Sequence, residues 1–396
     1  MLGANNLFKP GSVGYRVALG RAATIAAVAV GLVIFNAAPV VIGGLVAADG
    51  LGEATAANLV TAEFLAIALA SLAAAARVER QSLRTLAFLG ATIACGAQLA
   101  SAFLLPANRV LLGIYFGLRV LAGIGEGLLL CAANGALART RNAARVYAIA
   151  MFLSNVCSAV FFDVVPALQS RSPGSAFLVL SGTLLAALPL LLCLESTTSL
   201  KPRVIEPGGL VFSWLGLSSL ASVFLYSSAL GALWAFSELI GTHLGLSREQ
   251  AGQALALNLV AGLGGAGLAA VVNNRLGYLW PFVTGAAALA GASLVLGLGH
   301  SVVGFVAAQI VYGVLYPFTM SLMMAQLAEL DSRGRLVASA GGVLLIGFAV
   351  GPAIGAILVQ RGGLAPLGIV VSSALLGSGL ILAGRALIPA QDSASL

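Results

Sequence analysis

Four ionisable side chains lie inside long apolar stretches of this sequence: Glu63, Arg119, Glu126 and Asp163. A charge near the centre of a bilayer costs roughly 3 kcal/mol or more, so such residues are candidates for function. Burial also disfavours the charged form of a carboxyl group, so a buried acid can carry a proton at neutral pH. We therefore expect Glu63, Glu126 and Asp163 to be candidate proton carriers, and Arg119 to recognise substrate.

Arg119 and Glu126 are seven residues apart, which is two helical turns and about 10 Å along one helix face. This separation is too long for a tight ion pair within the helix. Each residue could serve substrate or proton in turn, or the charges could fasten the helix to its neighbours. The acids have no obvious cation beside them in the sequence, and this favours proton coupling. Glu238, near the end of an apolar segment, is expected to be hydrated.

The composition predicts a chain that lies in a membrane. It is 60% hydrophobic and only 8% charged, with a mean hydropathy of +1.05, whereas soluble domains are about 25% charged. Uniformly apolar runs of about 20 residues indicate helices, because strands of a membrane barrel alternate in polarity. We expect no enzyme activity, cofactor, metal or nucleic-acid partner, since no nucleotide-binding loop, catalytic triad or metal-ligand cluster stands out.

The apolar segments form two sets of six. They cover residues 22–46, 54–76, 85–105, 111–137, 146–168 and 174–194, then 213–239, 250–272, 281–298, 302–330, 336–359 and 364–384. Loop residues recur at a constant offset: Arg141 and Arg335, for example, are 194 residues apart. The fold class predicted is an all-α polytopic membrane protein with twelve transmembrane helices in two six-helix pseudo-repeats. The predicted domains are 1–198 and 213–396, with a cytoplasmic linker at 199–212.

The basic residues predict the orientation of the helices. With a cytoplasmic N-terminus, 15 of the 20 Lys and Arg fall in inside segments and four in outside loops, and Arg119 lies within a helix. Cytoplasmic loops carry an excess of such residues. Both termini are therefore expected in the cytoplasm, and abundant Arg, Ala and Gly suit a bacterial inner membrane.

Two loops carry a family resemblance. Residues 75–84 and 270–277 contain Glu79-Arg80 and Asn274-Arg275 at equivalent places. They resemble the loop signature of the major facilitator superfamily, a small residue followed by acid-Arg-x-Gly-x-Arg. Glu79 replaces the usual Asp, and Asn274 replaces the acid in the second copy. The resemblance implies a latch on the cytoplasmic side formed by Glu79, Arg80, Arg84, Asn274 and Arg275.

Two helices carry further motifs. Residues 119–127 are similar to the superfamily's fourth-helix pattern Arg-x-x-x-Gly-x-Gly, with a fainter likeness to spinster-like lysolipid transporters. Residues 347–355 resemble a Gly-x-x-x-Gly-Pro-x-x-Gly signature of antiporters, although there it belongs to the fifth helix, and residues 154–159 lack it. Small residues let helices approach closely. The expected helix-packing residues are Gly347, Gly351, Pro352 and Gly355.

The resemblance also implies a central cavity lined by the first, fourth, seventh and tenth helices. Its expected liners are Asn36, Arg119, Glu126, Tyr226, Trp234, Gln309, Tyr312 and Tyr316. Ordinary packing or an interfacial belt is an alternative for the aromatic residues. In the repeat, Gln309 falls opposite Arg119, Tyr316 opposite Glu126 and Asn258 opposite Glu63, so the second half offers neutral groups where the first offers charge.

These observations predict a secondary active transporter that moves a small organic solute by alternating access. We expect proton coupling, and efflux of an amphipathic compound rather than uptake. One alternative is uptake of a small organic anion that Arg119 recognises; an alternative of another class is a lysolipid transporter or lipid flippase. The expected partners are the small-molecule substrate, protons and the lipid bilayer, and the chain is expected to be a monomer.

Overall fold

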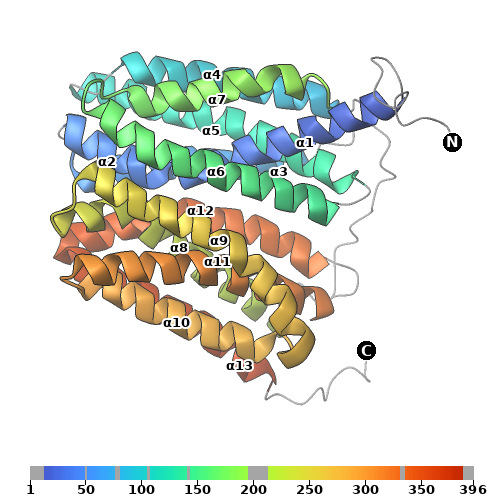
Figure 1. The fold of residues 1–396 in the computed structure, drawn as a ribbon, viewed down its shortest axis with the longest axis vertical. Helices are drawn as coiled ribbons and strands as arrows, with labels where there is room; N and C mark the ends of the chain where they lie inside the picture. The colour runs from blue at the N-terminus through green and yellow to red at the C-terminus, as the bar shows by residue number, and fades with distance from the viewer. Residues whose placement is uncertain are drawn as a thin grey trace. The chain divides into compact units, whose positions relative to one another are not determined.

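The computed structural model describes residues 13–49, 51–75, 81–104, 108–140, 143–194, 213–330 and 335–386. Within these ranges the chain forms thirteen α-helices and no strand (Figure 1). They are α1 (Val13–Asn36), α2 (Ala38–Asp49), α3 (Glu53–Ala75), α4 (Leu83–Phe103), α5 (Arg109–Ala138), α6 (Ala143–Gln169), α7 (Ser175–Leu191), α8 (Trp214–His243), α9 (Arg248–Leu276), α10 (Leu279–Leu298), α11 (Val302–Leu330), α12 (Arg335–Gly362) and α13 (Leu364–Ala386).

Eleven of the described helices are long and apolar enough to cross a bilayer, and α7, with 17 residues, is shorter. These twelve helices correspond to the twelve predicted segments, so the all-α, multi-pass prediction is confirmed. Side-chain caps begin several of them, among them Ser82 for α4, Asn108 for α5 and Ser213 for α8. Such caps satisfy backbone N–H groups that the first helical turn leaves without partners.

The first predicted segment differs from the prediction, because it comprises two helices. α1 and α2 are separated at Ala37, two residues before Pro39. Proline has no N–H to donate and its ring displaces the preceding turn, which interrupts a helix. The hydrogen bonds around the break still follow helical spacing, since Ala37 N donates to Val33 O and Val41 N donates to Ala37 O.

The chain divides into two compact units. Unit 1 comprises Met1–Leu51 and Ala62–Arg203, and unit 2 comprises Gly52–Thr61 and Val204–Leu396. The predicted linker 199–212 lies outside the described residues, and the predicted domain boundaries stay a prediction. In unit 1, α4 packs on α5 and α7; in unit 2, the main pairs are α8 with α12, α10 with α13 and α9 with α11.

Small residues dominate where the helices meet. The core of unit 1 around α4 and α5 includes Ala87, Ala91, Ala94, Ala132 and Ala133, all fully buried. Apolar side chains gain little by leaving lipid for protein, so helices in a membrane associate through close van der Waals contact and interhelical hydrogen bonds. Short side chains permit that close contact, and the few polar groups enclosed by it are the candidates for a site.

Candidate functional site

Arg119 is at the centre of a buried polar cluster in unit 1. Its Nη1 lies 3.2 Å from both carboxylate oxygens of Glu63, and the two side chains are 1% and 6% exposed. Nη1 also donates to Gln98 Oε1 over 3.0 Å, and Nη2 donates to Ser101 Oγ. Charge-assisted bonds of this kind are stronger than bonds between neutral groups. Arg119 therefore has a carboxylate partner, which contradicts the expectation that the buried acids lack a nearby cation.

Two aromatic rings complete the surroundings of the guanidinium group. Arg119 Cζ lies 5.6 Å from the ring centroid of Tyr115 and 4.5 Å from that of Phe177. A cation within about 6 Å of an aromatic face is attracted by the ring quadrupole. Tyr115 comes from α5 and Phe177 from α7. These two rings and the hydrogen-bond partners together enclose the guanidinium group.

Glu126 joins the same cluster through Gln98 of α4. The Gln98 amide nitrogen donates to Glu63 Oε1 over 2.9 Å and to Glu126 Oε1 over 2.7 Å. All four side chains are buried: Gln98 is 0% exposed, Arg119 1%, Glu126 2% and Glu63 5%. Glu126 is therefore connected to Arg119 through a neighbouring helix, although the two lie far apart along their own helix.

The cluster combines two carboxyl groups with one guanidinium group. If both acids were ionised, the cluster would carry one uncompensated negative charge, and a buried unpaired charge is strongly destabilising. One bound proton balances the charge. Among the described residues Glu126 Oε2 has no hydrogen-bond partner and is inaccessible, so this oxygen can carry the proton without displacing an existing bond.

Glycines of α5 bring the three helices close enough to form this cluster. A Cβ at Gly123 would collide with the Glu63 carbonyl oxygen of α3, and a Cβ at Gly127 would collide with that of Ile67. On another side of α5, Gly125 meets the carbonyl oxygen of Gly90 on α4. The fourth-helix glycine pattern therefore has a direct packing role: it places Glu63 and Gln98 against the α5 face that bears Arg119 and Glu126.

Unit 2 contains a neutral counterpart of this arrangement. Asn258 of α9 donates from Nδ2 to Gln309 Oε1 of α11 over 2.9 Å, and both side chains are buried. A Cβ at Gly313 would collide with the Asn258 carbonyl oxygen, just as one at Gly123 would collide with that of Glu63. The helix contact is thus repeated in the second unit, with an amide pair in place of the ion pair.

The hydroxyl groups of two predicted cavity liners are used in helix packing. Tyr226 OH donates to Tyr316 O over 3.2 Å and also contacts Thr319 Oγ1, and Tyr312 OH donates to Leu230 O over 3.1 Å. These bonds match the alternative of ordinary packing within unit 2. The Tyr316 ring meets the Phe348 ring edge-on at 6.2 Å.

The remaining predicted liners occupy different helices. Asn36, the last residue of α1, donates from Nδ2 to Ser158 Oγ of α6 over 3.1 Å. Trp234 lies in α8 and is half-buried. A common cavity for the eight predicted liners stays a prediction.

The packing motif in α12 lies against α8. A Cβ at Gly347 would collide with Ser227, and one at Gly351 would lie within 2.7 Å of the Gly231 backbone. Gly355 faces the Phe236 ring in the same way. Pro352 is buried within the same helix. In unit 1, the α1–α6 pair instead includes the Asn36–Ser158 hydrogen bond.

Only part of the predicted latch can be placed. Arg84 donates from Nε to Leu194 O over 3.1 Å, beyond the carboxyl end of α7. A cation near the carbonyl end of a helix is favoured by the helix dipole. Glu79 and Arg80 lie outside the described residues, and Asn274 and Arg275 are described as part of α9 but not in their side chains.

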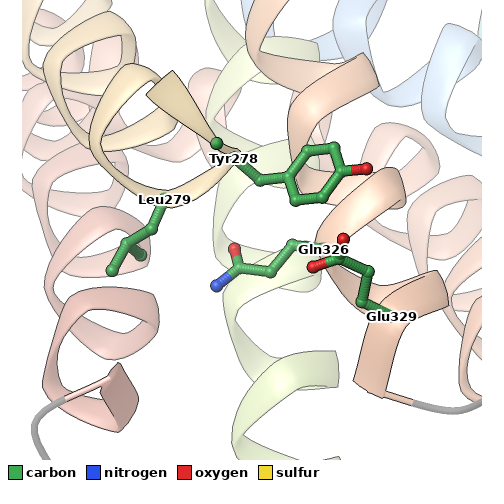
Figure 2. Close-up of a pocket in the computed structure, with 5 residues that line it drawn as sticks. Tyr278, Leu279, Gln326 and Glu329 are labelled. Carbon is green, nitrogen blue, oxygen red and sulfur yellow. The ribbon is translucent and has the colours of Figure 1, made fainter. Parts of the chain in front are cut away.

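A polar recess of about 370 Å³ lies at the residues that come directly after Asn274-Arg275 in the sequence (Figure 2). It is lined by Gly277, Tyr278, Leu279, Gln326 and Glu329. Figure 2 shows the Tyr278 ring beside the side chains of Gln326 and Glu329, which come from the end of α11. The turn depends on Gly277, whose φ of +71° is unfavourable for residues with a Cβ.

Two other acids differ from expectation. Asp163 of α6 is exposed, so the prediction that it is a buried acid is wrong. Glu238 of α8 was expected to be hydrated, but it is 0% exposed and its Oε1 accepts from Arg248 Nε over 2.7 Å. Both differences arise because the packing of neighbouring helices, rather than depth along the segment, decides how far a side chain is enclosed by protein.

A long apolar groove lies on the surface of unit 1 along α3, α4 and α5. Its volume is about 960 Å³. Small and aliphatic side chains such as Ala62, Ala73 and Val120 form most of it, and Gln81, Ser82 and Thr85 form a polar end. The groove is open along α3 because the α3 side chains that line it are mostly alanines, which are too small to fill it.

No protein-family model matches this sequence, and neither does any curated protein. Among solved structures, it is similar to a D-xylose–proton symporter, with a TM-score of 0.70 and 16% identity over 91% of this chain and 96% of the other. It is also similar to a variant of the nucleoside transporter NupG, with a TM-score of 0.71 and 13% identity over 93% and 98% of the two chains. Both neighbours are transporters rather than enzymes, and the likeness confirms the predicted major facilitator fold.

Proposed function

We propose that this chain, which has the major facilitator fold, is a secondary active transporter that couples movement of a small organic solute to protons by alternating access. The observation that carries the proposal is the buried cluster of two acids and one arginine in unit 1. The symporter it resembles is named for proton coupling.

In this proposal Glu63 and Glu126 share one transported proton, and Arg119 provides the compensating charge. Loss of the proton leaves the cluster with excess negative charge, which buried surroundings penalise. The charge change can therefore bias one conformation of the transporter over another, as coupling requires.

The remaining features of the proposal come from the sequence. The positive-inside bias supports a multi-pass protein with both termini in the cytoplasm, in a bacterial inner membrane. The antiporter-like motif at residues 347–355 supports efflux. The latch residues would close the cytoplasmic side, and the chain would act as a monomer.

Recognition of an organic anion by Arg119 is less well supported than the coupling role. The guanidinium group is bonded to Glu63, Gln98 and Ser101 and lies over the Phe177 ring. An incoming carboxylate would have to displace Glu63. The geometry therefore supports Arg119 as a partner of the proton site.

The apolar groove supports a second candidate function, transport of a lysolipid or another lipid. The groove offers aliphatic walls and a polar end at Ser82 and Thr85, which suits an acyl chain with a polar head. Ala73→Trp would fill it, since Ala73 is exposed in its wall. Loss of fluorescent lysophosphatidylcholine transport in proteoliposomes containing this variant would support lipid transport; unchanged transport would count against it.

Proton coupling can be tested in proteoliposomes that enclose a pH-sensitive dye. Compounds that raise the thermal stability of the purified protein are first selected from a panel of sugars, nucleosides, organic anions and amphipathic cations, because specific binding stabilises the folded state. Each selected compound is then added across the membrane. We expect at least one to move protons, and expect Glu126→Gln to abolish that movement.

Leu99→Ala is a matched control, because Leu99 is exposed on α4 next to Gln98 in sequence. It should leave proton movement intact. A selected compound that crosses the membrane equally well with and without a pH gradient, and moves no protons, would refute the proposal.

A further inference from the structure

Gln98 makes hydrogen bonds to every charged residue of the cluster. It lies on α4, is 0% exposed and was not among the residues that the sequence pointed to. Its amide nitrogen donates to Glu63 and Glu126, and its amide oxygen accepts from Arg119. Both N–H groups and the carbonyl oxygen of the side chain are thus used within one site.

The chemistry of the partners determines the orientation of this amide. Arginine has only donors, so the Gln98 atom that faces Arg119 has to be the oxygen. The nitrogen is then directed at the two carboxyl groups, and each of its hydrogens meets a different acid. The reverse orientation would place N–H against N–H at Arg119 and oxygen against oxygen at ionised carboxylates.

A shared nitrogen holds the two acids close together. Glu63 Oε1 and Glu126 Oε1 lie within 2.9 and 2.7 Å of the same atom, so they are no further apart than these two distances combined. At such a separation the charge on one carboxyl group acts directly on the other. The other titratable or charged groups recorded at the cluster are Arg119 and, against its guanidinium group, Tyr115.

We infer that Gln98 is a positioning residue that holds Glu63 and Glu126 on one amide nitrogen so that a single proton serves both acids. The inference rests on the proposed proton site, and it adds the residue that holds the two acids of that site together. Gln98 itself does not titrate. It acts by keeping both carboxyl groups at one donor and by keeping Arg119 against Glu63.

The counterpart position in unit 2 provides a matched comparison. Ser293 lies 195 residues after Gln98, the same offset that relates Asn258 to Glu63. Its hydroxyl donates to Leu289 O on its own helix, over 2.8 Å. Among the described residues, no third side chain bridges the neutral Asn258–Gln309 pair as Gln98 bridges the charged cluster.

The test is a pH titration of the purified full chain by infrared spectroscopy, which detects the carbonyl band of protonated carboxyl groups and needs no substrate. Glu126→Gln and Glu63→Gln identify the band. In Gln98→Met the acids lose N–H donors that favour their ionised form. The band should therefore persist to a pH about one unit higher, a ten-fold change in proton affinity.

Gln98→Asn, which is one methylene shorter and cannot reach both acids, should shift the band in the same direction by less. It also decides the question if Gln98→Met does not fold, as judged by thermal unfolding. Ser293→Ala should titrate like the wild type. If both Gln98 variants also titrate like the wild type, the positioning role is refuted. If the wild type shows no band that either Glu variant removes, the proton site itself is refuted.

Discussion

The buried pairs Glu63–Arg119 in unit 1 and Asn258–Gln309 in unit 2 occupy the same place in two copies of one helix contact. In both, a glycine of the partner helix packs on the backbone carbonyl of the first residue of the pair. One pair is ionic and the other is a hydrogen bond between two amides. Since the amide pair satisfies the same helix contact, the architecture does not require the charges, and their presence in unit 1 needs another reason.

The stability of the fold also gives no reason to keep the charges. Desolvating a buried ion pair costs about as much as the attraction between its charges returns, so replacing it with neutral groups is often harmless, whereas removing one partner is strongly destabilising. A chain that retains two acids and one arginine in its interior therefore retains them for what the charges do. Proton binding is the role that this composition supports.

The largest effect is expected when the charged pair is broken on one side. Arg119→Gln leaves two acids without a cation and should destabilise the protein by about 3–5 kcal/mol. The double change Glu63→Asn with Arg119→Gln copies the unit 2 pair and should recover most of that loss while proton coupling stays abolished. Thermal unfolding and proton movement measure the two effects. A double variant no more stable than Arg119→Gln would show that the pairs are not interchangeable.

The second prediction concerns the glycines that both units share. Gly123→Ala and Gly313→Ala each place a Cβ against a backbone carbonyl on the neighbouring helix. Each should cost about 1–3 kcal/mol, the usual effect of overpacking. Gly117→Ala, on α5 where a Cβ meets open space, is the control in the same unfolding measurement. A large loss at only one of the two glycines would mean that the contact is not truly repeated.

The third prediction uses Glu238, a buried acid of unit 2. Arg248→Gln removes the cation from Glu238, but Arg248 is 21% exposed and water weakens the pair. We expect a loss of about 1–2 kcal/mol, smaller than for Arg119→Gln. Arg171→Gln, at an exposed position after α6, is a suitable control. A loss as large as that of Arg119→Gln would show that burial of the cation matters less than we infer.

The smallest effect on stability is expected for Glu126→Gln. The change keeps one acceptor oxygen for Gln98 and removes the need for a bound proton, so unfolding should change by less than about 1 kcal/mol. Proton movement in proteoliposomes should nevertheless be lost. Retained proton movement in this variant would transfer the carrier role to Glu63.

Much of the fold could be predicted from local sequence. Apolar segments of membrane-spanning length predicted the all-α, multi-pass fold, and the loop and fourth-helix motifs pointed to its class. Counting along the two halves of the sequence also predicts that Asn258 is the repeat counterpart of Glu63, and Gln309 that of Arg119. Local sequence did not predict the contacts between helices. Gln98 belongs to no motif, and the signal that could have pointed to it was a polar amide within the third apolar segment.

Hydropathy and helical spacing are properties of neighbouring residues, so the sequence by itself determined the helices, their repeat and the rarity of their charges. Only the tertiary structure decided which charges meet. Asp163 and Glu126 are both acids within apolar helices, yet one is exposed and the other is buried beside Gln98. The physical reason is that glycine contacts between α3, α4 and α5 bring together side chains that are 21 to 56 residues apart in sequence, a relation that no local pattern encodes.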